Sequence, residues 1–395
     1  MRRLVGIAAA LCVAAAAVSA QDAQKVLETY RRNFAIASLD VKIQILQDAA
    51  AAPGTAELGP LYQQALEFVL ENISLLPADP RFRQLAVIAA DQVAAIGYAA
   101  ARTALWRLFQ EDSETGTRIR TATALGAVGA GDPEVVDHLN RFLDSQNALF
   151  AAGKGSDQQV VPAILRALGR LGDPSSFPSL FTAMVLGYTD ETTRVARESL
   201  LAVKGELREL LAGVVKSGQP AEKLEALRMG VESERIPDPD KAKLAELALD
   251  VGLHTSASDT GSRASLRAMR VTAARTLRDR AWQAASPLLI EHLDMTIMEV
   301  DRGLADKGSL LEAIASLGIM GTHEAAVRLT QYLVLLNSYT EKGKGYDEQV
   351  VAAVIENIGL LADKVAFDDL MYTQYLNYSN AIKKAARAAL ERLRW

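Results

Sequence analysis

The segment Phe142–Val203 contains the run Gly153-Lys154-Gly155-Ser156-Asp157-Gln158-Gln159-Val160-Val161, and it returns near the end of the chain as Tyr332–Leu393. Equivalent positions lie 190 residues apart (343 − 153 = 190), and 20 of the 62 positions are identical without a gap. Self-similarity at a fixed period is typical of repeat proteins, whose units bury their apolar faces by packing against their neighbours. The repeat therefore predicts an architecture, although it does not identify a ligand.

The clearest single unit is Thr117–Leu143. Its first half places Ala122, Leu125 and Val128 on one side of a helix, and Gly129-Ala130-Gly131 ends that helix. Asp132-Pro133 then starts a second helix, because Asp caps free backbone N–H groups and Pro fits the first turn. The same pair recurs as a predicted helix start at Asp79-Pro80, Asp173-Pro174 and Asp238-Pro239.

The run Ala124-Leu125-Gly126-Ala127-Val128-Gly129 followed by Asp132-Pro133 resembles the HEAT repeat, particularly its short bacterial form named after phycobilisome lyases. The run Ala167–Pro174 repeats the pattern almost literally. The resemblance implies an all-α protein, an α-solenoid of roughly eight to nine stacked antiparallel helix pairs. HEAT proteins act mostly as scaffolds and adaptors, so the resemblance also implies a role in recognition.

A second self-match extends the duplication towards the N-terminus. Ala89–Phe109 aligns without gaps on Ala273–Leu293 at an offset of 184 (273 − 89 = 184). We therefore predict an N-terminal half over 21–216, a joining segment of helix pairs over 217–260 and a C-terminal half over 261–395. The joining segment holds the strongest helix-breaking signals, such as Gly218-Gln219-Pro220.

Residues 1–20 are typical of a secretory signal peptide. Arg2 and Arg3 precede an apolar run rich in Ala, and Val18-Ser19-Ala20 offers a small-residue cleavage site. A retained transmembrane anchor is the alternative, although the run is short for a span of about 20 residues. We predict an exported protein, periplasmic or secreted, without stable insertion in the membrane after cleavage.

The charge and cysteine content exclude several classes of site. Cys12, the sole Cys, lies within the signal, so the mature chain holds neither a disulfide nor a thiolate metal site. Loss of Arg2 and Arg3 changes the formal charge from −5 to −7, because Lys plus Arg falls from 43 to 41 against 48 Asp plus Glu. An acidic chain without a basic tract predicts no nucleic-acid partner.

Two loops carry Gly-Lys-Gly between predicted helices. Lys154 and Lys344 are candidate contacts to an acidic partner. The alternative is that the glycines supply a positive φ and the lysines are merely solvated. Neither loop is a phosphate-binding P-loop, because the upstream Gly is absent.

Tyrosines are concentrated in the C-terminal copy. Tyr332 and Tyr378 match Phe142 and Tyr188 and are predicted to lie in the core. The others match Leu149, Ser156 and Thr182 and are predicted to lie on the surface, as candidate partner-binding residues or an end cap: Tyr339, Tyr346 and Tyr372.

No catalytic, cofactor or metal site is predicted. His323-Glu324 lacks the second His of a zinc motif, and no nucleophile elbow or Rossmann glycine set is present. All four His residues are predicted to be solvated or on helix faces. Asp368-Asp369 is interpreted as a pair of solvent-facing charges.

The sequence therefore favours a non-catalytic scaffold or adaptor that binds a protein partner in the cell envelope along its solenoid surface. Two alternatives remain. One is a cell-wall glycan-binding module that uses the C-terminal tyrosines. The other is a bilin-lyase-like enzyme, which the resemblance allows but the export signal disfavours.

Overall fold

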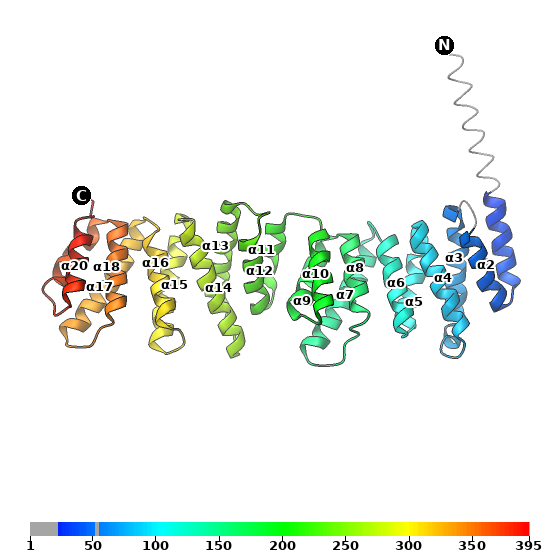
Figure 1. Cartoon of the computed structure of the whole chain (residues 1–395), viewed down its shortest axis with the longest axis horizontal. Helices are drawn as coiled ribbons and strands as arrows, with labels where there is room; N and C mark the ends of the chain where they lie inside the picture. The colour runs from blue at the N-terminus through cyan, green and yellow to red at the C-terminus, as the bar shows by residue number, and fades with distance from the viewer. Residues whose placement is uncertain (1–22, 52–54, 395) are drawn as a thin grey trace, which may run out of the picture. The chain divides into compact units, whose positions relative to one another are not determined.

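The computed structural model describes residues 23–51 and 55–394, and these residues form an all-α protein (Figure 1). The predicted signal at 1–20 lies outside the described residues. Within them no strand is present, and an isolated parallel bridge joins Asp363 to Arg394. The predicted all-α class is confirmed.

The described residues form two compact units, one that ends at Lys204 and one that begins at Gly205. The helices of the predicted joining segment 217–260 lie in the second unit. The described residues contain ten helix pairs, five in each unit, rather than the predicted eight to nine.

The first unit begins with a helix over 23–36. It continues with α2 (Leu39–Ala51), α3 (Gly59–Glu71), α4 (Pro80–Ile96), α5 (Arg102–Glu111), α6 (Thr115–Val128), α7 (Pro133–Ala151), α8 (Val161–Leu171), α9 (Phe177–Leu186) and α10 (Asp190–Ala202). The second unit consists of α11 (Leu207–Ser217), α12 (Pro220–Glu232), α13 (Asp238–His254), α14 (Thr260–Asp279), α15 (Ser286–Asp301), α16 (Lys307–Gly318), α17 (His323–Glu341), α18 (Glu348–Leu361), α19 (Phe367–Thr373) and α20 (Asn380–Leu390).

Within each unit the helices pack in two rows (Figure 1). In the first unit α2, α4, α6, α8 and α10 contact one another in that order, and α3, α5, α7 and α9 pair with them. In the second unit α12, α14, α16, α18 and α20 form one row and α11, α13, α15, α17 and α19 the other. The core lies between the rows, where Leu139 and its counterpart Leu329 are fully buried.

Glycines set the close approach of consecutive helices. A Cβ on Gly126 of α6 would lie 2.7 Å from the Cα of Ala167 on α8. A Cβ on Gly169 of α8 would lie 2.8 Å from the Cα of Ser199 on α10. Because a side chain would separate these backbones, the Gly of each Ala-Leu-Gly run is required by packing.

Aspartates cap the helix starts as predicted at three of the four Asp-Pro pairs. Asp79 accepts from the Arg81 N–H, Asp132 from those of Glu134 and Val135, and Asp173 from that of Ser175. The prediction is wrong at Asp238, which is the first residue of α13 rather than its cap. Asp238 instead forms a 2.9 Å ion pair with Arg280.

The first helix pair of each unit holds a buried lysine. Lys223 Nζ on α12 donates to the carbonyl oxygens of Val215 and Lys216 on α11, both at 2.7 Å. Lys42 on α2 likewise donates to the carbonyl oxygens of Phe34 and Ala35 at the end of the helix over 23–36. Burial lowers the pKa of both lysines. Each lysine thus satisfies carbonyls that the preceding helix leaves open at its C-terminus.

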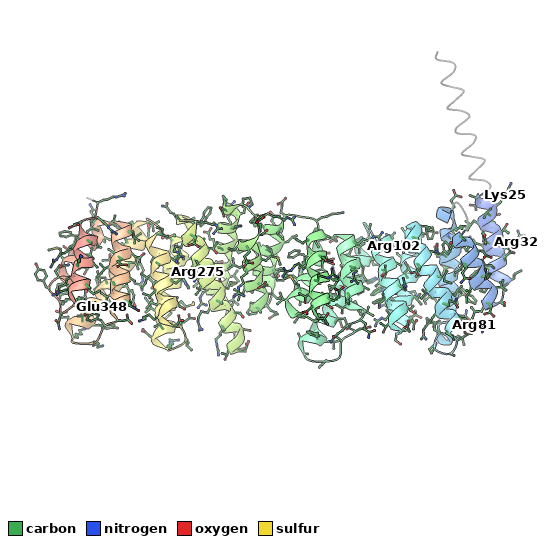
Figure 2. All side chains as sticks on the ribbon, viewed as in Figure 1. Lys25, Arg32, Arg81, Arg102, Arg275 and Glu348 are labelled. Carbon is green, nitrogen blue, oxygen red and sulfur yellow. The ribbon has the colours of Figure 1, made fainter. Side chains whose placement is uncertain are left out.

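Ion pairs join successive helix pairs within each unit, and Figure 2 shows several of the arginines that make them. Arg102 of α5 pairs with Asp132, the cap of α7, at 2.8 Å. At the corresponding place in the second unit, the hydroxyls of Ser286 and Thr322 share a 2.6 Å hydrogen bond. The connection between pairs is therefore kept while its chemistry changes.

Candidate functional site

The two Gly-Lys-Gly loops are helix-terminating motifs. Gly153 and Gly343 have φ of +66° and +69°. The N–H of Lys154 donates to Leu149 O and that of Lys344 to Tyr339 O, both at 2.9 Å. These 6→1 hydrogen bonds define the Schellman cap that ends α7 and α17. The first glycine of each loop is thus required by its left-handed conformation, as the structural alternative predicted.

The lysines of these loops are exposed, as predicted. Lys344 Nζ lies 4.7 Å from the centroid of the Tyr339 ring, a cation–π geometry. At an exposed site such a contact stabilises by only about 0.5–1 kcal/mol. Both ammonium groups therefore remain accessible to a ligand.

The tyrosines divide differently from the prediction at one position. Tyr332 and Tyr378 are buried, and Tyr339 and Tyr372 are exposed, as predicted. Tyr346 is half-buried, and its ring centroid lies 4.8 Å from that of Tyr378 with the planes at 72°. Its hydroxyl accepts a 3.1 Å hydrogen bond from the N–H of Ser379. Tyr346 is therefore only partly exposed, because one side of its ring packs on Tyr378.

An exposed apolar surface lies on the second half of α17 and on α19. Val334, Leu335 and Tyr339 are 46%, 41% and 38% exposed on α17. Tyr372 of α19 is 39% exposed, and its hydroxyl donates at 2.8 Å to Glu341, which lies two helical turns beyond Val334. This hydrogen bond raises the pKa of Tyr372. We define the tyrosine face by these exposed residues: Val334, Leu335, Tyr339 and Tyr372.

Val334 and Leu335 were missed by the sequence reasoning. Their counterparts 190 positions earlier are Asp144 and Ser145, both exposed and polar. A comparison of the two copies could have found them, because polar residues in the first copy are replaced by apolar residues in the second. They were missed because apolar residues in an amphipathic helix are normally interpreted as core.

His292 lies on a helix face, as predicted, but that face is buried. This residue of α15 is 1% exposed, and neither ring nitrogen has a hydrogen-bond partner. Burial, together with the nearby positive charge of Arg270, lowers its pKa to about 3, so the ring is neutral. Arg270 is itself buried and pairs at 2.7 Å with Glu299.

The other histidines are more exposed than His292. His254 and His323 are exposed, and His138 stacks on Trp106 with ring centroids 4.5 Å apart. His323 Nδ1 lies 2.7 Å from Asp363 Oδ2, and this hydrogen bond raises the pKa of His323. Asp368 is exposed but Asp369 is half-buried, and burial followed by the charge of Asp368 raises the pKa of Asp369.

Two further structural findings bear on function. Across residues 23–51 and 55–394, no three His, Cys, Asp or Glu side chains are grouped so as to hold a metal ion. None of the helices in this described part of the chain is long and apolar enough to cross a membrane. In comparisons with known proteins, no family model and no curated protein matches the chain.

Proposed function

We propose that this protein is an exported, non-catalytic HEAT-like α-solenoid that binds a protein partner in the cell envelope. The tyrosine face carries the proposal. An exposed apolar patch marks a binding surface, because a partner that covers it removes apolar side chains from water. Tyr supplies a large contact area with few rotatable bonds. The equivalent surface of the first unit is polar at Asp144 and Ser145, so the apolar character is not required by the repeat.

The serial packing of helix pairs supports the solenoid part of the proposal. Within each unit, the helices contact their partners in the pair, and most of them also contact the equivalent helix of the next pair, which is how solenoid repeats bury their apolar faces. Recognition surfaces in such proteins extend over several repeats. Lys344, which packs on Tyr339, adds a positive charge beside the apolar face.

The export part rests on the signal-like residues 1–20 and on the absence of Cys from residues 21–395. Without Cys, this part of the chain forms no disulfide bond. We assign the molecule a binding role, because its tyrosine face is an exposed apolar surface.

The double variant Val334→Asp/Leu335→Ser tests the proposal, because it copies Asp144 and Ser145 into the second unit. Affinity capture from a cell-envelope extract, with mass spectrometry, identifies a partner of the wild-type chain. The double variant should capture at least about tenfold less of that partner than the wild-type chain does. Its free energy of unfolding should change by less than about 0.5 kcal/mol, because both positions are exposed.

The control is Leu201→Ser, which removes a 60% exposed Leu from the first unit and should retain the partner. Tyr339→Ala and Lys344→Ala should weaken capture without unfolding the protein. Equal capture by the wild-type chain and the double variant would contradict the proposal.

Cell-wall glycan is a second candidate, favoured by Tyr375. This ring follows α19 and is 78% exposed, a geometry suited to stacking on a sugar. Co-sedimentation with isolated cell-wall sacculi, repeated with Tyr375→Ala, separates this candidate from protein binding. Sedimentation that is lost in the variant would favour glycan.

A further inference from the structure

A cleft of about 450 Å³ opens beside the first residue of α17. His323, Asp363, Lys364 and Arg394 contribute to its lining, together with apolar side chains. The tyrosine face occupies the second half of α17, so the cleft and that face are separate sites.

The backbone of the cleft is fixed by the turn that ends α18. Ala362 adopts a left-handed conformation with φ of +55°, which is unusual for a residue with a Cβ. Asp363 follows and accepts the N–H of Val365 at 2.9 Å. The N–H of Arg394 donates to Ala362 O at 2.9 Å and so holds the segment after α20 against this turn.

The charges that line the cleft are predominantly positive. Asp363 is its one carboxylate among the described lining residues, and it is occupied by His323 at 2.7 Å. Lys364 and Arg394 are exposed, and within residues 23–51 and 55–394 no carboxylate lies within 4.0 Å of either cationic group. Two exposed cations therefore line a recess that also has apolar side chains in its lining.

The first unit has the same backbone and keeps one of these positive charges, because Lys204 stands at the position of Arg394 (204 + 190 = 394). The N–H of Lys204 donates to Gly172 O at 3.0 Å, as the N–H of Arg394 does to Ala362 O. However, Pro133 and Pro174 stand where the second unit has His323 and Lys364 (133 + 190 = 323; 174 + 190 = 364). Because proline serves the same turns, the fold does not require His323 or Lys364. Only the second unit therefore carries these two side chains beside the turn.

We propose that this cleft binds an oxyanion, a carboxylate or a phosphate, through Lys364 and Arg394 with His323 as a further donor. Arg and Lys are the side chains that hold such groups by charge-assisted hydrogen bonds. The apolar wall formed by Leu361 and Val365 excludes water from one side of the bound group. The inference does not depend on the proposed partner-binding role, since it concerns a different surface.

The test is a titration of the full chain with sodium phosphate and, separately, with sodium acetate, at constant ionic strength set by NaCl. The imidazole NMR signals report binding, and the signal missing from His323→Gln identifies His323. We expect a saturable shift of the His323 signal with at least one probe. Tighter binding of phosphate assigns a phosphoryl ligand, whereas equal or tighter binding of acetate assigns a carboxylate.

The variant Lys364→Gln/Arg394→Gln should weaken that binding by about tenfold or more, because two charged donors are lost. The matched control Lys204→Gln, which neutralises the counterpart of Arg394 in the first unit, should bind as the wild-type chain does. A shift that does not saturate with either probe would overturn the proposal. So would a double variant that binds as tightly as the wild-type chain.

Discussion

Tyr188 and Tyr378 occupy equivalent positions, but the two copies surround them differently. In the first unit the Tyr188 ring stacks on Phe150 with centroids 4.1 Å apart, and its hydroxyl donates at 2.8 Å to Asn147 Oδ1. In the second unit Thr340 replaces Phe150, and the ring that packs on Tyr378 comes from Tyr346 in the loop, where the first unit has Ser156. The aromatic contact has moved from a helix to a loop.

Other contacts of the two copies are unchanged. Asn147 Nδ2 donates to Ser179 O at 3.1 Å, and Asn337 Nδ2 donates to Asp369 O at 3.3 Å, 190 positions further along. Both bonds tie one helix pair to the backbone of the next pair. The comparison indicates that backbone connections between pairs are retained, whereas side-chain packing changes when a neighbouring position compensates.

The largest expected effect is a matched pair of core truncations. Leu139→Ala and Leu329→Ala should each lower the free energy of unfolding by about 2–5 kcal/mol, because both side chains are fully buried at equivalent positions. Chemical denaturation of the full chain measures both. An effect confined to one copy would show that the two cores are not equivalent.

A second difference between the units is His292, whose counterpart in the first unit is Leu108 (108 + 184 = 292). The folded-state pKa of His292 is lowered to about 3, while an unfolded His titrates near its ordinary pKa of about 6.5. The unfolded chain therefore binds the additional proton as the pH falls below 6.5. The contribution of His292 to the free energy of unfolding is therefore fully present above pH 6.5. Below that pH it decreases by up to about 1.4 kcal/mol per pH unit.

His292→Leu should remove this part of the acid sensitivity. Urea denaturation at pH 7 and at pH 4.5 measures the slope in both chains, with the exposed His254→Leu as the control. A variant with the same loss of stability between the two pH values as the wild-type chain would contradict the assignment.

The glycines offer a smaller, sharper contrast. Gly169→Ala should lower the free energy of unfolding by about 1–3 kcal/mol, because the new Cβ would lie 2.8 Å from the backbone of Ser199. Gly359→Ala should be close to neutral. Its Cβ would lie 3.1 Å from the Ala389 side chain, and the greater helix propensity of Ala offsets a small displacement by about 1 kcal/mol. Equal melting temperatures for the two variants would refute this difference.

The smallest effect tests the moved aromatic contact directly. Phe150→Thr removes the ring that stacks on Tyr188, and adding Ser156→Tyr rebuilds the arrangement of the second unit. A double-mutant cycle by chemical denaturation should show a favourable coupling of about 0.5–1.5 kcal/mol. Strict additivity would mean that Tyr346 packs on Tyr378 for reasons that do not transfer to the first unit.

Much of the fold could be predicted because the repeat leaves its strongest marks where the backbone has special needs. Gly153, Gly169 and Asp132 each supply a conformation, a close approach or a cap that few other residues provide. The burial of His292 and the packing of Tyr346 could not be predicted, because both depend on neighbours from other helices. The tyrosine face was predicted in part, through Tyr339 and Tyr372.

Lys42 and Lys223 indicate that the duplication includes the first helix pair of each unit, which the sequence alignment does not show. Each reaches back to the third-last and second-last residues of the helix before it, at the opening of its own unit. An ancestral gene copied whole explains this coincidence, with the duplicated stretch extending well upstream of Ala89. The sequences of these early helices no longer show the duplication, but the hydrogen bonds from each lysine to the preceding helix are retained.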